Sequence, residues 1–269
     1  MNTYTILIVT YNSLGEICDL LGDLAFHTPD NSVLVIDNAS QDGTADLVYS
    51  RFPYVHLVHN AQNIGYARAV NQGIALCETP YILLLNPDIR ILEGKVLTEM
   101  LACMESQKKV AAAAPLQFKE DNKGHYINFS WSYLSSQAYK FYWEQRFHRG
   151  PLRAKMMKVT FLNTGCLMIR KAAFERVGKL NEKYFLYGEE PDLFLKFKRY
   201  GYACILLPNV SIIHYRERSI SKVKPMKRLS IRLLAINNII HALISGWGNI
   251  CFDFLTNQFP PKRHQNPTR

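Results

Sequence analysis

Short apolar strands alternate with amphipathic helices over the first 115 residues, and this alternation constrains the fold more than any other feature. Apolar runs of the kind found in buried parallel strands occupy residues 5–10, 32–37, 55–58, 81–86 and 110–115. Helical periodicity fills the intervals at 14–26, 43–51, 65–77 and 93–106. This order of elements predicts βαβ units and a parallel sheet that is covered by helices on both faces.

A polar cluster follows each of the first four predicted strands. The clusters are TYN at 10–12, DNASQDGT at 37–44, NAQNIGYARAVN at 60–71 and NPD at 86–88. Ligands of open α/β sheets bind beyond the carboxyl ends of the strands. Asn, Asp, Ser and Gly also make ordinary turns, so one cluster alone does not indicate a site. Four clusters at one edge of the sheet favour a ligand site there.

The second half of the chain is less regular. Residues 116–158 break the alternation, and the aromatic stretch 126–147 fits either strands with a loop over the site or a second packing layer. A strand and a short helix that stops at Gly178 follow, and then a helix from Pro191 to Gly201. Two further strands are expected at 203–208 and 210–215.

Four ionisable residues in this half are candidates for chemistry. Glu189, Glu190 and Asp192 gather at a helix N-terminus, where dipole compensation explains one or two acids but not an adjacent pair. His214 lies near the end of the last predicted strand. A lone histidine is more often structural than a ligand, so the pattern alone leaves its role open.

Several classes of protein are disfavoured. GxGxxG does not follow the first strand and GxxxxGK[ST] is absent, which argues against dinucleotide dehydrogenases and P-loop enzymes. The six cysteines are dispersed without a CxxC or Cys/His cluster, so we expect free thiols in a reducing compartment and no zinc site. Neither a signal peptide nor a run of 18 apolar residues is found, and a cytoplasmic location is expected.

The chain is basic, with a formal net charge of +10, and the excess is local. The segment 216–232 holds seven Lys or Arg and one Glu, a net of +6. Nucleic acid, anionic lipid and phosphorylated substrates all fit such a charge. The aromatics of 126–147 lack an RNP-like pattern, so no nucleic-acid partner is expected.

Several motifs together resemble family 2 glycosyltransferases. ILIVTYN, VIDNASQDGT, NIGYARAVNQG and LLLNPD stand in the family's order, and residues 161–202 are similar to its rhamnosyltransferase branch. The resemblance covers residues 4–216. It implies an α/β fold of GT-A type, with a Rossmann-like, mostly parallel sheet flanked by helices and a C-terminal helical extension. The implied catalytic domain is 1–218, with a nucleotide-sugar half to about 115 and an acceptor half from about 116, followed by an extension at 219–269.

The resemblance also implies a site. Asp88 and His214 would hold a divalent cation, Mg²⁺ or Mn²⁺, on the donor diphosphate. Asn86 stands where the family's Asp-x-Asp-type motif has its first acid. Glu190 falls on the family's catalytic base, one methylene longer than the usual Asp, with Glu189 before it and Asp192 as the alternative base. The implied donor-binding residues are Thr10, Tyr11, Asn12, Asp37, Asn63, Gly65, Arg68, Asn71 and Asn86.

The implied function is inverting transfer of a sugar, rhamnose from dTDP-rhamnose, to a cell-surface polysaccharide or lipid-linked glycan acceptor. A UDP- or GDP-hexose donor and a catalytically silent nucleotide-sugar-binding protein are the alternatives. A nucleotidyltransferase is disfavoured, because that class ordinarily has a glycine- and basic-rich loop after the first strand, where this chain has TYNSLGE.

The C-terminal stretch 222–258, which is basic and then amphipathic, suits an anionic membrane surface at the inner face of the cell membrane. Packing on the core and a dimer contact are its alternatives. The oligomeric state is not assigned.

Overall fold

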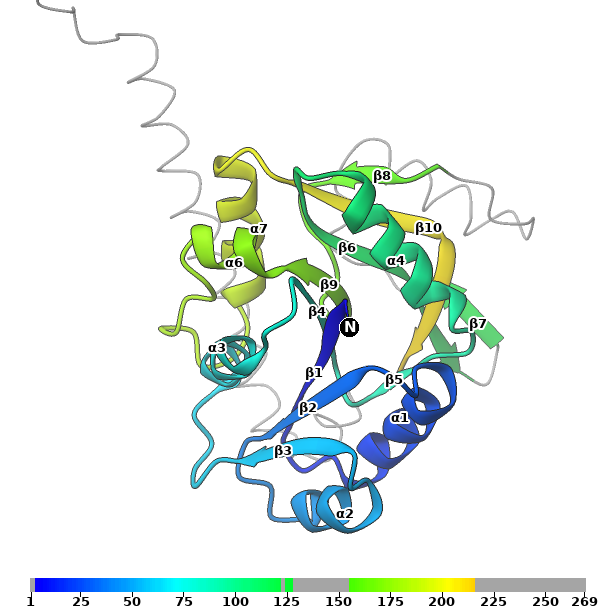
Figure 1. Cartoon of the computed structure of the whole chain (residues 1–269), viewed down its shortest axis with the longest axis vertical. Helices are drawn as coiled ribbons and strands as arrows, with labels where there is room; N and C mark the ends of the chain where they lie inside the picture. Colours follow the sequence, from blue (N-terminus) through cyan, green and yellow to red (C-terminus); the bar gives the residue numbers. More distant parts are fainter. Residues whose placement is uncertain (1–2, 122–123, 128–154, 216–269) are drawn as a thin grey trace, which may run out of the picture.

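A ten-stranded mixed sheet forms the centre of the protein (Figure 1). The computed structural model describes residues 3–121, 124–127 and 155–215. The strands follow the order β3-β2-β1-β4-β9-β6-β10-β5, with β7 beside β6 and β8 beside β10. Their bounds are β1 Tyr4–Thr10, β2 Ser32–Asp37, β3 Val55–His59, β4 Tyr81–Leu85, β5 Ile89–Arg90, β6 Val110–Asp121, β7 Gly124–Ile127, β8 Met157–Val159, β9 Cys166–Arg170 and β10 Ala203–His214.

Helices cover both faces of the sheet and enclose two apolar cores. One core contains side chains of α3 (Tyr66–Leu76), α6 (Lys171–Arg176) and α7 (Glu189–Arg199). The other contains those of α1 (Leu14–His27), α2 (Thr44–Arg51) and α4 (Lys95–Ser106). Figure 1 shows the two groups of helices on opposite sides of the strands. Strands β1, β2 and β4 between them are buried on both faces, as their continuous apolar sequences indicate.

One reversed strand determines where the site forms. Strands β1, β2, β3 and β4 are parallel neighbours, and so are β6 and β10. Strand β9 lies between β4 and β6 and is antiparallel to both. Strands β4, β6 and β10 therefore run in one direction, and their carboxyl ends meet at one edge together with the start of β9.

The structure confirms the mostly parallel sheet with flanking helices, and it corrects the sequence analysis in three places. The two strands expected at 203–208 and 210–215 are the single strand β10, whose pairing with β6 shifts register between Leu207 and Ser211. Pro208 lies in this irregularity, where a missing backbone donor is tolerated. Strand β5 was not predicted because two residues carry no periodicity.

The third correction concerns the start of α7. The helix begins at Glu189 rather than Pro191, with Gly188 as its N-cap at a φ of 100°. A proline is tolerated in the first helical turn because the backbone N–H groups there have no intrahelical acceptor. Both glutamates consequently belong to the first turn of the helix.

The unassigned region 116–158 contributes the rest of β6 together with β7 and β8, whereas residues 128–154 and the extension from 216 lie outside the described residues. Five cysteines fall in the described part and all five are free thiols, four of them buried. Cys251 lies outside it. Within the described ranges, no helix is long and apolar enough to cross a membrane.

We predict opposite effects of alanine at two helical glycines. A Cβ at Gly73 would overlap Leu7 of β1 and lie 3.2 Å from Ile36 of β2, whereas a Cβ at exposed Gly22 of α1 meets no atom within 4 Å. Gly73→Ala should lower stability by about 1–3 kcal/mol through overpacking. Gly22→Ala should raise it by up to about 1 kcal/mol through helix propensity. Thermal unfolding measures both, and equal shifts would contradict the close packing of α3 on the sheet.

Candidate active site

The ends of β4 and β10 meet through two ionisable side chains. Asp88 follows β4, His214 ends β10, and Asp88 Oδ1 lies 3.2 Å from His214 Nε2. The backbone N–H of Tyr215 donates to the Asp88 carbonyl at 3.0 Å, which fixes the two segments together. Both side chains are largely buried, with 11% and 5% of their areas exposed. Asp88 and His214 are 126 positions apart in the sequence, and the fold brings them into contact.

His214 is oriented by a chain of hydrogen bonds. The Gln117 amide nitrogen donates to the Asn163 carbonyl at 3.3 Å, which turns the Gln117 amide oxygen toward His214 Nδ1 at 2.8 Å. His214 therefore carries its proton on Nδ1. A Cβ at Gly165 would lie 2.5 Å from the imidazole, so only glycine allows the ring this position.

This orientation suits a cation ligand. With Nδ1 protonated, Nε2 presents a lone pair to the Asp88 carboxylate, and two acceptors at 3.2 Å need a proton or a cation between them. Adjacent ligands of an octahedral Mg²⁺ are about 2.9 Å apart, which is close to the observed separation. Among the described residues, no group of three or more His, Cys, Asp or Glu could hold a metal ion. The remaining ligands would come from the diphosphate and water.

The acid pair lies in the first turn of α7. Glu189 is 2% exposed, and burial, followed by the charge of Glu190, raises its pKa to about 8. Glu190 is more exposed than Glu189. Two adjacent carboxyls in different environments divide into one that keeps its proton at neutral pH and one that carries the charge.

Asp192 occupies a different environment from the pair. Its Oδ2 lies 2.7 Å from the Lys196 ammonium one helical turn later. The Lys196 ammonium thus neutralises the charge of the Asp192 carboxylate within the helix. The pairing favours Glu190 over Asp192 as the base, and the assignment stays a prediction.

Tyr66 joins the acid pair to Asp88. It is the first residue of α3, and its backbone N–H donates to the Phe185 carbonyl at 2.9 Å, just before α7. Burial raises the pKa of the Tyr66 phenol well above its ordinary value, and the charges of Glu190, Glu189 and Asp88 raise it further. The phenol therefore keeps its proton, and the charges of three carboxyl groups act on it.

At the ends of β1 and β2, Asp37 is fully buried and fully hydrogen-bonded. It accepts bonds from Thr10 Oγ1 at 2.9 Å, from the hydroxyl and backbone N–H of Ser40 at 2.6 and 3.0 Å, and contacts His59 Nδ1 at 2.8 Å. Asp37 and Thr10 consequently position this edge, and half-exposed His59 covers the carboxylate.

The neighbouring polar residues also bind one another. The Asn12 side chain accepts from the Gln41 backbone N–H at 2.8 Å, with Asn12 at a φ of 53°. Asn63 Oδ1 accepts from the Asn38 amide at 2.8 Å and from the Gly65 N–H at 3.0 Å. These bonds connect the loops after β1, β2 and β3 into one layer.

The other predicted donor-binding residues lie on or near this edge. A Cβ at Gly65, whose φ is 85°, would lie 2.8 Å from the Phe185 carbonyl, so the close approach of the chain requires glycine here. Tyr11 is about half exposed. The Asn86 N–H donates to the Gly165 carbonyl at 2.9 Å, which joins the end of β4 to the start of β9.

Arg68 and Asn71 hold the segment before α7. The Arg68 guanidinium lies 3.6 Å from the Glu182 carboxylate, and both side chains are more than half exposed. Buried Asn71 exchanges hydrogen bonds with the Leu180 backbone and also donates to Glu182 at 3.0 Å. The structure thus gives Asn71 a positioning role, and contact of either residue with a donor stays a prediction.

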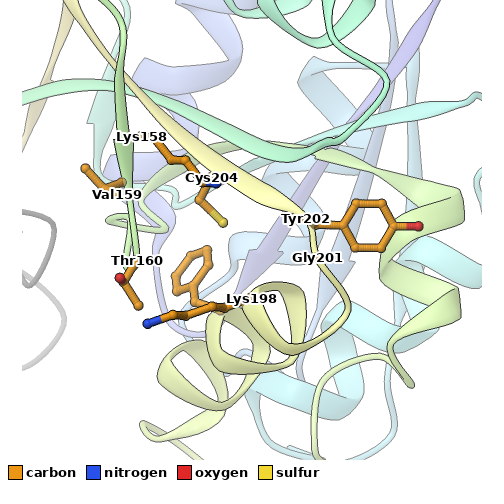
Figure 2. Close-up of a pocket in the computed structure, with 8 residues that line it drawn as sticks. Lys158, Val159, Thr160, Lys198, Gly201, Tyr202 and Cys204 are labelled. Carbon is orange, nitrogen blue, oxygen red and sulfur yellow. The ribbon is translucent and has the colours of Figure 1, made fainter. Parts of the chain in front are cut away.

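A pocket of about 210 Å³ opens elsewhere, between β8 and α7 (Figure 2). Lys158 and Thr160 border it on the strand side and Lys198 on the helix side. Its lining comes from the later part of α7 and the start of β10. The acid pair and His214 occupy the opposite ends of these two elements, so the pocket is separate from the site.

Comparison with known proteins identifies the family. The family profile described as glycosyl transferase family 2 matches residues 5–178. The chain belongs to glycosyl transferase family 2. The matched range includes Asp88 and Tyr66 but ends before the acid pair and His214, so the place of these residues in the site rests on the structure.

Two relatives carry rhamnosyltransferase names. The chain is 25% identical over 263 residues to the N-acetylglucosaminyl-diphospho-decaprenol L-rhamnosyltransferase of Mycobacterium tuberculosis, covering 90% of this chain and 85% of the relative. It is 24% identical over 262 residues to the dTDP-rhamnosyl transferase RfbF of Shigella flexneri, covering 94% and 79%.

Solved structures show the GT-A fold. The mannosyltransferase PcManGT of Pyrobaculum calidifontis, in complex with GDP-Man and Mn²⁺, matches with a TM-score of 0.58 and 15% identity, covering 97% of this chain and 82% of that one. GalNAc-T7, with UDP, GalNAc and Mn²⁺, matches with a TM-score of 0.60 and 15% identity, over 80% of this chain and 44% of that one.

Several residues of this family 2 site were not singled out from the sequence. Tyr66 lies inside the quoted motif NIGYARAVNQG, and its apolar ring fits a core residue equally well. Gln117 of β6 orients His214 together with Asn163 and Gly165, which lie in the segment before β9. No periodicity or spacing marks such residues, because their role exists only after the strands have assembled.

The Asp88–His214 pair generates a prediction about metal affinity. Asp88→Asn keeps the size of the side chain but removes its charge, so the affinity for Mn²⁺ in the presence of dTDP should fall at least about tenfold. Calorimetric titration with Mn²⁺ measures this change. Asp46→Asn, on the exposed side of α2, is the matched control and should bind as the wild type does. Unchanged affinity in Asp88→Asn would exclude Asp88 as a ligand.

The raised pKa of Glu189 generates a prediction about stability. The folded chain holds a proton on Glu189 that the unfolded chain releases above its ordinary pKa of 4.5, so folding stability falls as the pH rises from about 4.5 to about 8. Glu189→Gln removes this contribution, which is on the order of a few kcal/mol. Its melting temperature should therefore fall less between pH 5 and pH 8 than that of the wild type.

Exposed Glu105 of α4 supplies the control for this measurement. Glu105→Gln should keep the wild-type pH dependence of the melting temperature. If Glu189→Gln also keeps it, Glu189 is ionised in the folded protein.

Proposed function

We propose that the chain is a metal-dependent, inverting rhamnosyltransferase that uses dTDP-rhamnose and a lipid-linked glycan acceptor. The observation that carries the proposal is the meeting of the Asp88–His214 pair with the acid pair of α7 around Tyr66. A cation site and a base whose charges act on one buried hydroxyl suit displacement at an anomeric carbon. The sugar is proposed from the names of the two relatives, which cover most of this chain.

In the proposed reaction, Glu190 accepts the proton of the acceptor hydroxyl as its oxygen attacks the anomeric carbon. The bond from that carbon to the diphosphate oxygen breaks, and the configuration inverts. Glu189 keeps its own proton and leaves the negative charge on Glu190. A divalent cation held by Asp88 and His214 would neutralise charge on the leaving diphosphate.

The edge after β1, β2 and β3 supports a donor site beside this centre. Its loops form one hydrogen-bonded layer around Asp37, which fixes the half-exposed His59 at the surface. A preorganised polar layer binds a nucleotide with little loss of side-chain freedom. Binding of the base and ribose by this layer is part of the proposal, as is membrane contact through 222–258, which lies outside the described residues.

Calorimetric titration tests the donor directly. We expect dTDP-rhamnose to bind in the presence of Mn²⁺ and not with EDTA, and UDP-glucose and GDP-mannose to bind at least about tenfold more weakly. Preferential binding of UDP-glucose or GDP-mannose would replace the proposed sugar but keep the transferase site. Equal binding with EDTA would contradict the metal dependence.

A further inference from the structure

Among the described residues, four buried side-chain atoms have no hydrogen-bond partner: the Tyr66 hydroxyl, Glu189 Oε2, Asn163 Nδ2 and Asp192 Oδ2, the last of which lies in the ion pair with Lys196. Two of these atoms, on Tyr66 and Glu189, come from adjoining elements at the acid pair. The Tyr66 hydroxyl and Glu189 Oε2 are each buried, and neither bonds to any residue in the described ranges. Tyr66 as a whole is partly buried against the core, whereas its hydroxyl oxygen is fully buried. Buried polar atoms in native proteins almost always have partners, because an unmade bond costs free energy.

The two atoms belong to adjoining elements. The start of α3 packs on the segment before α7, because the Tyr66 N–H donates to the Phe185 carbonyl and Gly65 touches the Phe185 backbone. The charges of Glu190 and Glu189 act on the Tyr66 phenol. An unpartnered donor and an unpartnered acceptor thus lie near one another but do not bond.

Direct bonding would satisfy both atoms, and the fold does not use it. A hydroxyl group, like a water molecule, satisfies both at once, since it accepts one hydrogen bond and donates another. Sugars carry such groups. The position beside the proposed base and Asp88 is where the reacting sugars would meet.

We propose that Tyr66 and Glu189 together bind one sugar hydroxyl, with the Tyr66 phenol donating to the hydroxyl oxygen and the hydroxyl donating to Glu189 Oε2, which acts as the carbonyl oxygen of the neutral carboxyl group. This inference rests on the proposed transferase function and adds a specificity residue, Tyr66, to its site. The hydroxyl belongs to the donor sugar or to the acceptor sugar. The two sources share one chemistry and are separated by experiment.

Tyr66→Phe is the test, because it removes the hydroxyl and keeps the ring. If the hydroxyl is on the donor, the Kd for dTDP-rhamnose should rise roughly tenfold by calorimetry with Mn²⁺, the size of one hydrogen bond, while the Kd for dTDP stays unchanged. If it is on the acceptor, both constants stay unchanged and the KM for a GlcNAc-diphosphoryl lipid should rise by a similar factor.

Stability separates this role from a structural one. Tyr66→Phe removes a buried atom that has no partner in the described ranges, so its melting temperature should equal or exceed that of the wild type. Tyr81→Phe is the matched control, because the Tyr81 hydroxyl accepts a bond from Arg170 at 3.0 Å at the far end of β4. It should lower the melting temperature and leave both sugar-binding constants unchanged.

Two results would overturn the inference. One is a Tyr66→Phe variant with wild-type donor affinity and wild-type acceptor KM. The other is a Tyr66→Phe variant that is less stable than the wild type, which would make the hydroxyl structural whatever the donor. If the wild type prefers UDP-glucose, the proposal of rhamnose as the donor sugar is wrong. The test of Tyr66→Phe is then made with UDP-glucose and UDP in place of dTDP-rhamnose and dTDP.

Discussion

The contact between Asp88 and His214 depends on the reversed strand β9. Strand β9 pairs with β4 and with β6 in the antiparallel sense, so its start lies beside the carboxyl ends of these two strands. The ends of β4 and β10 consequently face the same edge. The segment before β9 then supplies Asn163 and Gly165, which fix Gln117 and make room for the imidazole. One reversed strand thus assembles residues from four segments.

The site concentrates negative charge in a basic chain. Asp88, Glu189 and Glu190 act on one phenol, although the chain as a whole carries +10. Burial, followed by the charge of Glu190, raises the pKa of Glu189, which therefore keeps its proton at neutral pH. The remaining charge favours a cation near Asp88 and positive charge that develops at an anomeric carbon near Glu190. The proton on Glu189 neutralises part of this negative charge, and the charge that remains attracts a cation.

Local patterns predicted the elements, and the assembled sheet supplied the site's internal contacts. The alternation of apolar runs and helical periodicity was sufficient for β1 to β4, β6 and α1 to α4, because these elements bury whole faces. It failed at Pro208 and Pro191, where tertiary pairing and the tolerance of the first helical turn outweigh the local preference of proline. Asp88 and Glu190 stood out by sequence resemblance. The role of Gln117 depends on a contact across 97 residues, which no local pattern encodes.

The hydrogen bonds of each buried polar group separate residues that build the site from residues that act in it. Asp37 and Asn71 are buried with their oxygens bonded, so substitutions there would reduce stability together with binding. Tyr66 and Glu189 have buried atoms without bonds in the described ranges, so the fold is less stable for containing them. A protein retains such groups where activity requires them, since stability alone favours their replacement. The unmade bonds of Tyr66 and Glu189 therefore indicate the place where substrate completes the structure.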